Sequence, residues 1–341
     1  MTTARPRLDD VARLAGVSRA TASKALNGRS DVSPATRDRV ASAAAELGYQ
    51  GVGVGPTVPL IGLVADNMTT TYTLDILRGA TAAAMAAGVG LVTQYSEGLP
   101  PVGAHPLSDS WFEQVKRSGW LGVIVVTTKL SRRQLKKVAE LQLATVAIDP
   151  GNALPPAVTS IGATNWNGGV EATEHLIRLG HRSIGFVRGT TGSVPAAERL
   201  QGYLSALMMH DLPHDARLVA GDEFSAEAGL RAGLELLSLP EDIRPTAVFA
   251  ANDAIALGVY QAARQLGLHV PDDLSVVGFD DSLLAPLVTP PLTTVSQPLE
   301  DMGAAAVRTL VDISQSRPVT GGPIRLATSL SVRASTAPPA R

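Results

Sequence analysis

The stretch LDDVARLAGVSRATASKALNG, from Leu8 to Gly28, decides how the N-terminal part of the chain folds. Its apolar residues Val11, Leu14 and Ala15 are three or four positions apart, so they share one face of a first helix. Gly16 follows and permits the left-handed backbone turn that ends this helix. The stretch therefore predicts a short helix, a tight turn and a second short helix.

The second helix has two chemically different faces. Ser18 is placed to cap its first turn. An apolar face consists of Ala22, Ala25 and Leu26. The opposite face consists of Arg19, Ala20, Ser23, Lys24 and Asn27. One face is therefore expected to be core and the other to be exposed.

A third helix follows from Pro34, with Ser33 as its cap and Gly48 as its end. Its buried stripe is expected to contain Val40, Ala44 and Leu47. Three short helices around a small apolar core form a helix-turn-helix unit, whose second helix lies in the major groove of DNA. Two capped helices joined by a glycine turn also occur in proteins that never bind DNA.

The charge of the chain favours the DNA-binding interpretation. The first 50 residues contain eight Arg and Lys residues and five Asp and Glu residues, a net charge of +3, whereas the whole chain has −2. A locally basic segment on an otherwise acidic chain is typical of a DNA-binding head.

Length and composition set limits on the remainder. About 280 of the 341 residues follow the head, which suits two domains of ordinary size. The chain has no cysteine, so disulfides, thiolate zinc sites and thiol nucleophiles are excluded. The N-terminal stretch MTTARPRLDD has no apolar run, and LGVIVV, from Leu121 to Val126, is too short to span a bilayer. We therefore expect a cytoplasmic protein without a membrane segment.

From Pro59 onward, short β-branched runs alternate with amphipathic stretches rich in Ala and Leu. Such alternation indicates parallel sheets covered by helices on both faces. It restarts after Asn165, so two similar α/β halves with a cleft between them are predicted. The predicted strands are LIGLVADN, VGLVTQYS, GVIVVTT, ATVAIDP, SIGFVRG, TAVFA and LSVVGFDD. The predicted helices span residues 74–88, 111–118, 131–141, 165–180, 196–210, 226–237 and 252–267.

Polar side chains follow several of these strands directly. In open parallel sheets, ligands bind at the carboxyl ends of the strands. Carboxylates and amides pair with vicinal hydroxyls, Arg donates in a fork, and aromatic faces stack on sugar rings. The post-strand carboxylates and amides are Asp66, Asn67, Asp149, Asn252, Asp253, Asp280 and Asp281, with Arg199 and the aromatic residues Tyr72, Trp166 and Phe224 in or after such loops. This set favours a cleft for a polyol.

Several of these residues have simpler interpretations that the sequence leaves open. Asn252 and Asp253 also fit the cap of the following helix, Asp281 fits a solvated surface, and Phe224 fits the core. His175 and His181 flank the end of a predicted helix, where we expect them to meet the terminal carbonyls and not a metal.

Enzymatic chemistry has no recognisable motif here. The chain contains no GxSxG elbow, no GxxxxGK[ST] loop, no HExxH and no glycine fingerprint after its first strand. We therefore expect neither catalysis nor a cofactor.

The head resembles the N-terminal headpiece of the LacI/GalR family of bacterial transcription factors. The similar stretches are DVARLAGVS, TASKALNG, VSPATRDRV and LGY. Two departures are Ala22, where the family usually has a larger β-branched residue, and Lys24, where Arg is frequent. The resemblance implies that Arg19, Ala20 and Lys24 face base edges, and that Ser18, Thr21, Ser23, Asn27 and Tyr49 contact phosphates.

The resemblance continues through the core, in IGLV, ATEHLIRLGHRSIGFVRG, AERLQGY, FAANDAIALGVYQAARQLGLHVPDDLSVVGFDDS and PPLTTVSQP. It implies an all-α helix-turn-helix head followed by a periplasmic-binding-protein-like α/β core of two Rossmann-like parallel-sheet subdomains. By this likeness Arg199, Asn252, Asp280 and Gln297 meet the effector, with Trp166 and Phe224 nearby. To these we add Tyr72 and Asp149 from the loop positions, and we leave Asp253 and Asp281 as structural.

The expected domain organisation combines both lines of reasoning. The head spans residues 1–50, a linker 51–58, the effector-binding and dimerisation core 59–335, and a tail 336–341. Within the core, a first subdomain of residues 59–162 and 292–320 and a second of residues 163–291 and 321–335 are expected.

Two functions from different classes fit these features. The first is a homodimeric transcription factor, most simply a repressor, controlled by a mono- or oligosaccharide effector and bound to double-stranded operator DNA. The second is a sugar-binding sensor of the periplasmic type. The basic head and the lack of a signal sequence favour the first. A purine effector and an activator remain compatible with the residues.

The segment QGVGVGPTVP, from Gln50 to Pro59, departs from the family pattern. There the family has a helix that carries a leucine into the central minor groove, whereas this segment is shorter and has no leucine. Each glycine disfavours a helix interior by about 1 kcal/mol and proline by about 3 kcal/mol. A flexible tether is therefore predicted, with weaker operator binding or weaker coupling than the family norm. The alternative is that DNA or a partner orders this segment.

Overall fold

The computed structural model describes residues 6–26, 29, 31–47, 49, 58–96, 105–319 and 322–340. The chain divides into two compact units, residues 1–58 and 59–341. The predicted Gly-rich linker lies outside the described residues, apart from Val58. In the part of the chain that the structure describes, no helix is both long and apolar enough to cross a membrane.

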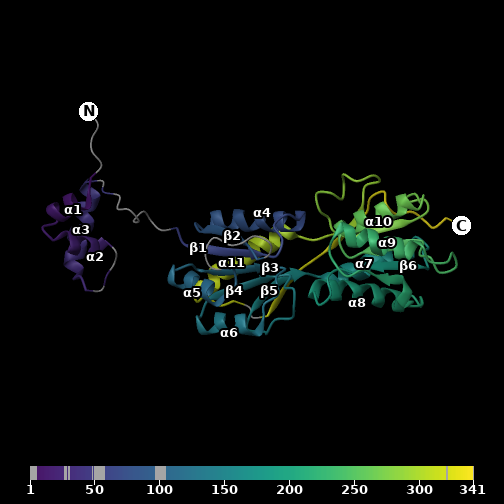
Figure 1. Cartoon of the computed structure of the whole chain (residues 1–341), viewed down its shortest axis with the longest axis horizontal. Coiled ribbons are helices and arrows are strands. Elements are labelled where there is room, and N and C mark those ends of the chain that lie inside the picture. Colours follow the sequence, from purple (N-terminus) through teal and green to yellow (C-terminus); the bar gives the residue numbers. More distant parts are fainter. Residues whose placement is uncertain are drawn as a thin grey trace, which may run out of the picture. The chain divides into compact units, whose positions relative to one another are not determined.

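The first unit is a three-helix head (Figure 1). Its helices are α1 (Leu8–Leu14), α2 (Arg19–Leu26) and α3 (Pro34–Leu47). Gly16 has a φ of 64° in the turn between α1 and α2, as predicted. The Ser18 hydroxyl accepts the backbone amide of Thr21 at 3.0 Å and so caps α2. The prediction of a helix-turn-helix unit is confirmed.

The buried face of α1 differs slightly from the one expected. Val11, Ala12 and Ala15 are buried, whereas Leu14 is 47% exposed. With 3.6 residues per turn, a face centred on these three buried positions leaves Leu14 at its edge. On α2, Ala22 and Ala25 are buried as predicted, so a thin core of small side chains holds the head together.

The second unit begins with a six-stranded parallel sheet in the order β11-β5-β4-β3-β1-β2. Its strands are β1 (Leu60–Ala65), β2 (Gly90–Tyr95), β3 (Gly122–Val126), β4 (Ala144–Ile148), β5 (Thr159–Ala163) and β11 (Pro323–Leu326). The first four were predicted, whereas β5 and β11 were not.

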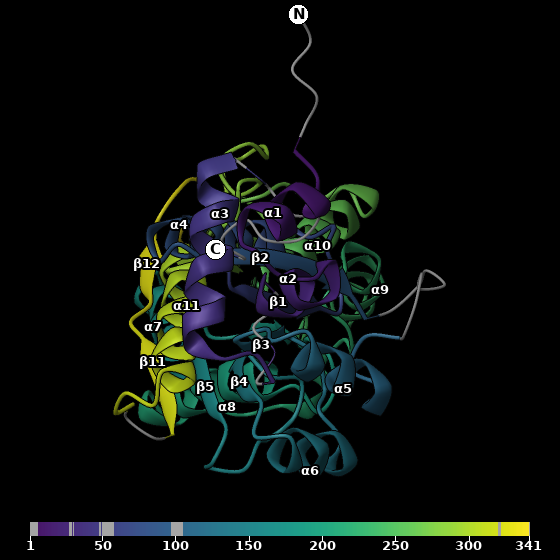
Figure 2. The ribbon, with the colours of Figure 1, turned by 90° about the vertical axis from the view of Figure 1, so that its left-hand side faces the viewer.

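Helices cover both faces of this sheet (Figures 1 and 2). They are α4 (Thr71–Ala86) and α11 (Leu299–Ser314) on one face, and α5 (Asp109–Arg117) and α6 (Arg132–Glu140) on the other. Successive residues of β3 alternate between the two: Ile124 packs in the cluster with α4 and α11, and Val125 in the cluster with α5. This two-sided burial explains why the strands are continuous apolar runs.

The second sheet has the order β12-β10-β9-β8-β6-β7, and only the described pair β10 and β12 is antiparallel. Its strands are β6 (Ile184–Val187), β7 (Val219–Ala220), β8 (Ala247–Ala250), β9 (Ser275–Asp280), β10 (Thr293–Ser296) and β12 (Ser329–Ser331). The helices packed with it are α7 (Asn165–Arg178), α8 (Val194–Met209), α9 (Ala226–Leu237) and α10 (Asp253–Gln265), and a short 3-10 helix, η1 (Ala216–Leu218), precedes β7.

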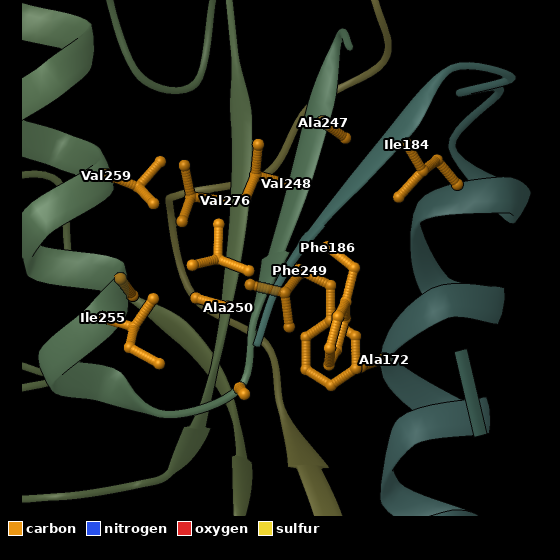
Figure 3. Close-up of a cluster of buried hydrophobic side chains, with 14 of the residues drawn as sticks. Ala172, Ile184, Phe186, Ala247, Val248, Phe249, Ala250, Ile255, Val259 and Val276 are labelled. Carbon is orange, nitrogen blue, oxygen red and sulfur yellow. The ribbon is translucent and has the colours of Figure 1, made fainter. Parts of the chain in front are cut away.

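An aromatic cluster fills the core of this second half. The rings of Phe186 and Phe249 meet edge to face, with centroids 5.1 Å apart. Figure 3 shows them beside Ala172 of α7, with Ile255 and Val259 of α10 across the strands. Two similar α/β halves are therefore present, as predicted.

The chain crosses between the halves at places that differ from the expected boundaries. The strand β10 pairs with β9 in the second sheet, so residues 292–296 do not belong to the first subdomain. The strand β11 pairs with β5 in the first sheet, so residues 323–326 do not belong to the second. The crossovers lie after β5, after β10 and after β11. The strands β10 and β11 are short and contain few apolar residues, so the sequence did not indicate which sheet each of them joins.

The two histidines near the end of α7 hold the C-terminal segment. His181 donates from Nε2 to the Ala337 carbonyl at 2.9 Å, and its Nδ1 is 2.9 Å from the Thr246 hydroxyl. His175 Nε2 is 3.0 Å from the Thr336 hydroxyl. The expectation that these side chains meet helix-terminal carbonyls is wrong, because the segment predicted as a tail runs past α7 and supplies their partners.

A close helix crossing in the first half gives a stability prediction. A Cβ at Gly303 of α11 would lie 2.1 Å from the Ile76 carbonyl oxygen of α4. Gly303→Ala should therefore lower the free energy of unfolding by roughly 1–3 kcal/mol in urea denaturation, although Ala alone favours a helix. Arg308→Ala, at an exposed position of α11, is the control. A Gly303→Ala chain as stable as the wild type would contradict the crossing.

Candidate functional site

The residues expected to contact DNA lie on and just before α2. Ser18, Arg19, Ala20 and Lys24 are exposed, and Thr21 and Ser23 are half-buried. Tyr49 is half-buried and packs against the head core, and Asn27 lies outside the described residues. The polar face of α2 therefore points outward, opposite the buried face.

Both cations of this face form ion pairs with carboxylates. The Lys24 ammonium is 2.7 Å from Asp31 Oδ2, and Arg19 Nε is 3.5 Å from Asp9 Oδ1. The hydrogen bond from Lys24 lowers the pKa of Asp31. Exposed pairs of this kind stabilise a fold little, so either cation can exchange its carboxylate for a DNA acceptor.

The carboxyl end of the first sheet contributes Asp149 and Tyr72. Asp149 directly follows β4, is 5% exposed and has a φ of 41°. Tyr72, in the first turn of α4, donates its hydroxyl to Asp149 Oδ2 at 2.8 Å. Burial raises the pKa of Asp149, against the opposing effects of the Arg199 charge and the Tyr72 hydrogen bond. Burial also raises the pKa of Tyr72, so the phenol remains a donor.

The guanidinium of Arg199 is the buried cation of the second half. Arg199 lies one turn into α8, is 3% exposed, and stacks its Cζ 3.8 Å from the ring centre of Phe279. Its Nε donates to Asn165 Oδ1 at 2.9 Å and its Nη1 to the Ala251 carbonyl at 2.6 Å. The remaining terminal nitrogen, Nη2, donates no hydrogen bond to any residue that the structure describes.

Asp280 lies at the end of β9, beside Arg199 and Gln297. Its Oδ1 is 3.5 Å from Arg199 Nη1 and accepts a 2.7 Å hydrogen bond from Gln297 Nε2. Burial, together with the charges of Asp253 and Asp149, raises the pKa of Asp280 to about 7, against the lowering effects of Arg199 and of the hydrogen bond from Gln297. Asp149 follows the last residue of β4 in the first sheet, and Asp280 ends β9 in the second sheet.

Backbone strain marks the same two positions. Asp149, directly after β4, has a φ of 41°, and Asp280, the last residue of β9, has a φ of 110°. Non-glycine residues adopt such angles only where the surroundings hold them, and they cluster at ligand sites. The strain therefore supports a functional role for these two carboxylates.

Three of the residues with simpler interpretations have partners within the protein. Asn252 caps α10, because its Oδ1 accepts the Ile255 amide at 2.8 Å. Asp253 is buried and accepts the Thr294 hydroxyl at 2.6 Å. Asp281 is 2.7 Å from Arg333 Nη2. These three carboxylate and amide groups hold neighbouring elements in place.

The two aromatic residues of the second half differ in position. The Phe224 ring centre is 5.8 Å from Arg199 Cζ, so Phe224 lies beside the buried cation. The Trp166 indole donates to the Ser205 hydroxyl at 3.2 Å and is 39% exposed, between α7 and α8. Its neighbour Asn165 contacts Arg199 instead. Sequence reasoning missed Asn165, because no strand was predicted before it and it was taken only as the start of a helix.

A pocket of about 450 Å³ lies between residues of the first half, on α4 and α11, and residues at or directly after the ends of β9 and β10 of the second half. Its lining residues are Asp75, Arg78, Asp280, Asp281, Gln297, Pro298, Leu299, Glu300 and Asp301. The buried Oε1 of Gln297 has no hydrogen-bond partner among the residues that the structure describes. Among the described residues, no group of three or more His, Cys, Asp and Glu side chains is arranged to hold a metal ion.

The donor and acceptor set of the cleft suits a hydroxylated ligand. Asp149 and Asp280 can accept from hydroxyls, Arg199 Nη2 can donate, and Gln297 Oε1 can accept. Each hydroxyl of a sugar both donates and accepts, so a sugar can pair with acceptors and donors on both sides.

The raised pKa of Asp280 has a consequence for stability. In the unfolded chain this carboxyl loses its proton near pH 4, whereas in the folded chain it keeps it until about pH 7. The folded state thus binds more protons between these values, and the free energy of unfolding falls as pH rises through the window. Asp280→Asn removes this loss. The variant should gain roughly 2–4 kcal/mol over the wild type between pH 4 and pH 8 in urea denaturation.

The matched control for this measurement is Asp272→Asn, at an exposed position of the same half. Its stability difference from the wild type should stay within about 0.5 kcal/mol at every pH. Parallel pH curves for Asp280→Asn and the wild type would show that Asp280 is not buried as a protonated carboxyl.

Comparison with known families covers both units of the chain. Residues 7–51 match a family model described as bacterial regulatory proteins, lacI family. Residues 173–336 match a model described as periplasmic binding protein-like domain.

Curated relatives match along nearly the whole chain. Catabolite control protein A of Priestia megaterium is 31% identical over 337 residues, 96% of this chain and 98% of the relative. The HTH-type transcriptional regulator CelR of Thermobifida fusca is 34% identical over 346 residues, 97% and 98% of the two chains.

Solved structures agree. A complex of the transcriptional regulator CelR with cellobiose has a TM-score of 0.72 at 32% identity, over 97% of this chain and 100% of that one. The Lac repressor dimer bound to operator and the anti-inducer ONPF has a TM-score of 0.75 at 30% identity, over 98% and 100%. The resemblance inferred from the sequence is thus confirmed, and the chain belongs to the LacI family of bacterial transcriptional regulators.

Proposed function

We propose that this chain is an effector-controlled repressor that binds operator DNA as a homodimer and senses a mono- or oligosaccharide in the cleft of its core. The observation that carries the proposal is the buried contact of Asp280 with Arg199 and Gln297 beside a pocket, on a chain that also has a helix-turn-helix head. Relatives matched over their full length are regulators, which favours binding without catalysis and without a cofactor.

DNA recognition is assigned to the exposed face of α2. The ammonium of Lys24 suits guanine N7 and O6, and the methyl group of Ala20 suits a thymine methyl. Arg19 is proposed as the third base contact. Phosphates are assigned to Ser18, Thr21, Ser23, Asn27 and Tyr49. In free protein the Lys24 ammonium contacts Asp31, so binding replaces that partner.

A homodimer is proposed because one small head neutralises too few phosphates to hold an operator at physiological salt. The Lac repressor structure with operator is of a dimer, which supports this assignment. Two heads on one dimer predict an operator of two inverted half-sites.

A sugar is proposed as the effector because the cleft combines carboxylates, an amide and a guanidinium with the aromatic ring of Phe224. Two relatives support the class: CelR was solved with cellobiose, and another relative is a ribose operon repressor from Escherichia coli, 34% identical over 310 residues. Tyr72 and Asp149 are assigned to one side of the sugar, and Arg199, Phe224, Asp280 and Gln297 to the other. Asn252 and Trp166 complete the assigned set.

A thermal-shift screen over mono- and disaccharides, including cellobiose and ribose, tests the effector class. A bound sugar raises the melting temperature by mass action. In vitro selection of DNA by the full chain tests the operator, and the expected result is a sequence with two inverted half-sites. If no sugar shifts the melting temperature, the sugar assignment is wrong. If selection enriches no sequence, the regulator is not a sequence-specific DNA-binding protein.

The variant Asp280→Ala separates the two sites. It should weaken binding of the sugar found in the screen by roughly thirtyfold or more, because a buried acceptor for its hydroxyls is lost. The head does not involve Asp280, so affinity for the selected DNA should stay within about twofold. Asp272→Ala is the control in both assays. A variant that still binds the sugar as the wild type does would remove Asp280 from the effector site.

A further inference from the structure

A chain of hydrogen bonds and one ion pair runs from Arg199 to the opposite half of the core. The Asn165 side chain accepts from Arg199 Nε at 2.9 Å and donates from its Nδ2 to Glu198 Oε2 at 3.0 Å. The other oxygen of Glu198, Oε1, is 3.7 Å from Arg325 Nη2. Arg325 belongs to β11 of the first sheet, whereas Arg199, Asn165 and Glu198 belong to α7 and α8 of the second half.

The contacts of Asn165 fix the direction of its amide. Asn165 is 1% exposed, and its Nδ2 donates both to Glu198 and to the Ala163 carbonyl at 3.2 Å. Two acceptors on one side leave the amide oxygen for the Arg199 guanidinium. A reversed amide would place two donors together in a buried site, which costs more than a lost hydrogen bond. Glu198 therefore sets the orientation that Arg199 requires.

Arg325 lies beside the effector cleft as well as beside Glu198. A Cβ at Gly162 of β5 would lie 2.6 Å from Asp149 Oδ1 and 3.4 Å from Arg325 Nη1, so both side chains flank this residue. The Arg325 charge lowers the pKa of Asp149, while the Glu198 charge raises it. The positive charge of Arg325 therefore partly neutralises two carboxylates, Asp149 of the first half and Glu198 of the second.

The same region contains two of the chain crossovers. The Thr164 and Thr328 hydroxyls are 3.0 Å apart, and the Thr328 amide donates to the Thr164 hydroxyl at 3.0 Å. Asn165 follows Thr164 directly, and Arg325 precedes Thr328 by three residues. Arg325 and Glu198 therefore form an ion pair between the two halves close to these crossovers.

We propose that Asn165 and Glu198 are positioning residues that aim Arg199 at the effector, and that Arg325 makes this aim depend on how the two halves of the core are arranged. The effector itself rests on the function proposed above. A change in these contacts should then alter both the affinity for the effector and the distance between the two halves of the core.

The sizes of the expected effects differ along the chain of contacts. The hydrogen bond between Asn165 and Arg199 is buried and involves a charge, so Asn165→Ala should weaken effector binding about tenfold or more. Glu198 and Arg325 keep 32% and 30% of their side chains exposed, and at 3.7 Å their attraction is modest. Arg325→Gln should therefore weaken binding by about two- to threefold.

The binding test uses cellobiose or ribose, whichever the wild-type chain binds, in isothermal titration. Glu198→Gln and Arg325→Gln should each weaken binding, and the double variant should bind no worse than Glu198→Gln alone, because both changes remove one contact. Asp109→Asn and Arg133→Gln, which break a 2.7 Å ion pair between α5 and α6, are the matched controls. Affinities equal to the wild type for Glu198→Gln and Asn165→Ala would overturn the proposal.

An exchange of groups separates positioning from mere structural support. The single variant Asn165→Asp places a carboxylate against that of Glu198. The repulsion between the two should weaken effector binding strongly. In the double variant Asn165→Asp with Glu198→Gln, the new Gln amide can donate to the new carboxylate, which still accepts from Arg199. Partial recovery of affinity is expected. No recovery, in a double variant that melts at the wild-type temperature, would contradict a relay through these atoms.

A ligand-free measurement keeps this test independent of the sugar assignment. The chain has no cysteine, so Lys136→Cys and Glu235→Cys, at exposed positions of the two halves, can carry a unique pair of spin labels. Labelled chain diluted with unlabelled chain gives the distance between halves by pulsed electron resonance. Arg325→Gln should broaden or shift this distance, and Asp109→Asn should not. If neither cellobiose nor ribose binds the wild type, this comparison alone decides the relay, and an unchanged distance distribution would overturn it.

Discussion

The buried guanidinium of Arg199 is the constraint on which the effector half of the core depends. A cation 3% exposed must be matched by acceptors, and three elements supply them: Asn165 from α7, the Ala251 carbonyl after β8, and Asp280 at the end of β9. The stack on Phe279 fills the face of the group that cannot form hydrogen bonds. Because these partners come from different strands and helices, the position of one side chain ties the loops at the cleft to each other.

Several buried polar groups of the same cleft lack a full set of partners among the described residues, as expected of a ligand site. Burial raises the pKa of both Asp149 and Asp280, and Gln297 keeps a buried oxygen without a partner. A fold optimised for stability alone would have filled these positions with apolar or fully paired groups. A polyol whose hydroxyl groups pair with these buried oxygens satisfies them, and the free energy of this pairing contributes to affinity for the effector.

Patterns among residues close together in the sequence predicted most of the helices and strands. The cap at Ser18, the glycine turn at Gly16 and the buried apolar strands follow from residues close in sequence, and the structure confirms them. The short strand β11 carries no such signal, since its place is determined by β5, more than a hundred residues away. Asn165 was missed for the same reason, because its partner Arg199 is set by the packing of α7 on α8 and not by spacing.

Family membership joins this cleft to the helix-turn-helix head, and the central claim is that occupation of one changes affinity at the other. Linkage requires that a sugar which lowers operator affinity is itself bound more weakly on operator DNA, by the same factor. The most direct measurement is therefore the dissociation constant of the sugar for the full chain, by isothermal titration, with and without the operator obtained by selection. We predict an affinity at least about fivefold weaker in the presence of operator. Equal affinities in the two titrations would contradict coupling between cleft and head.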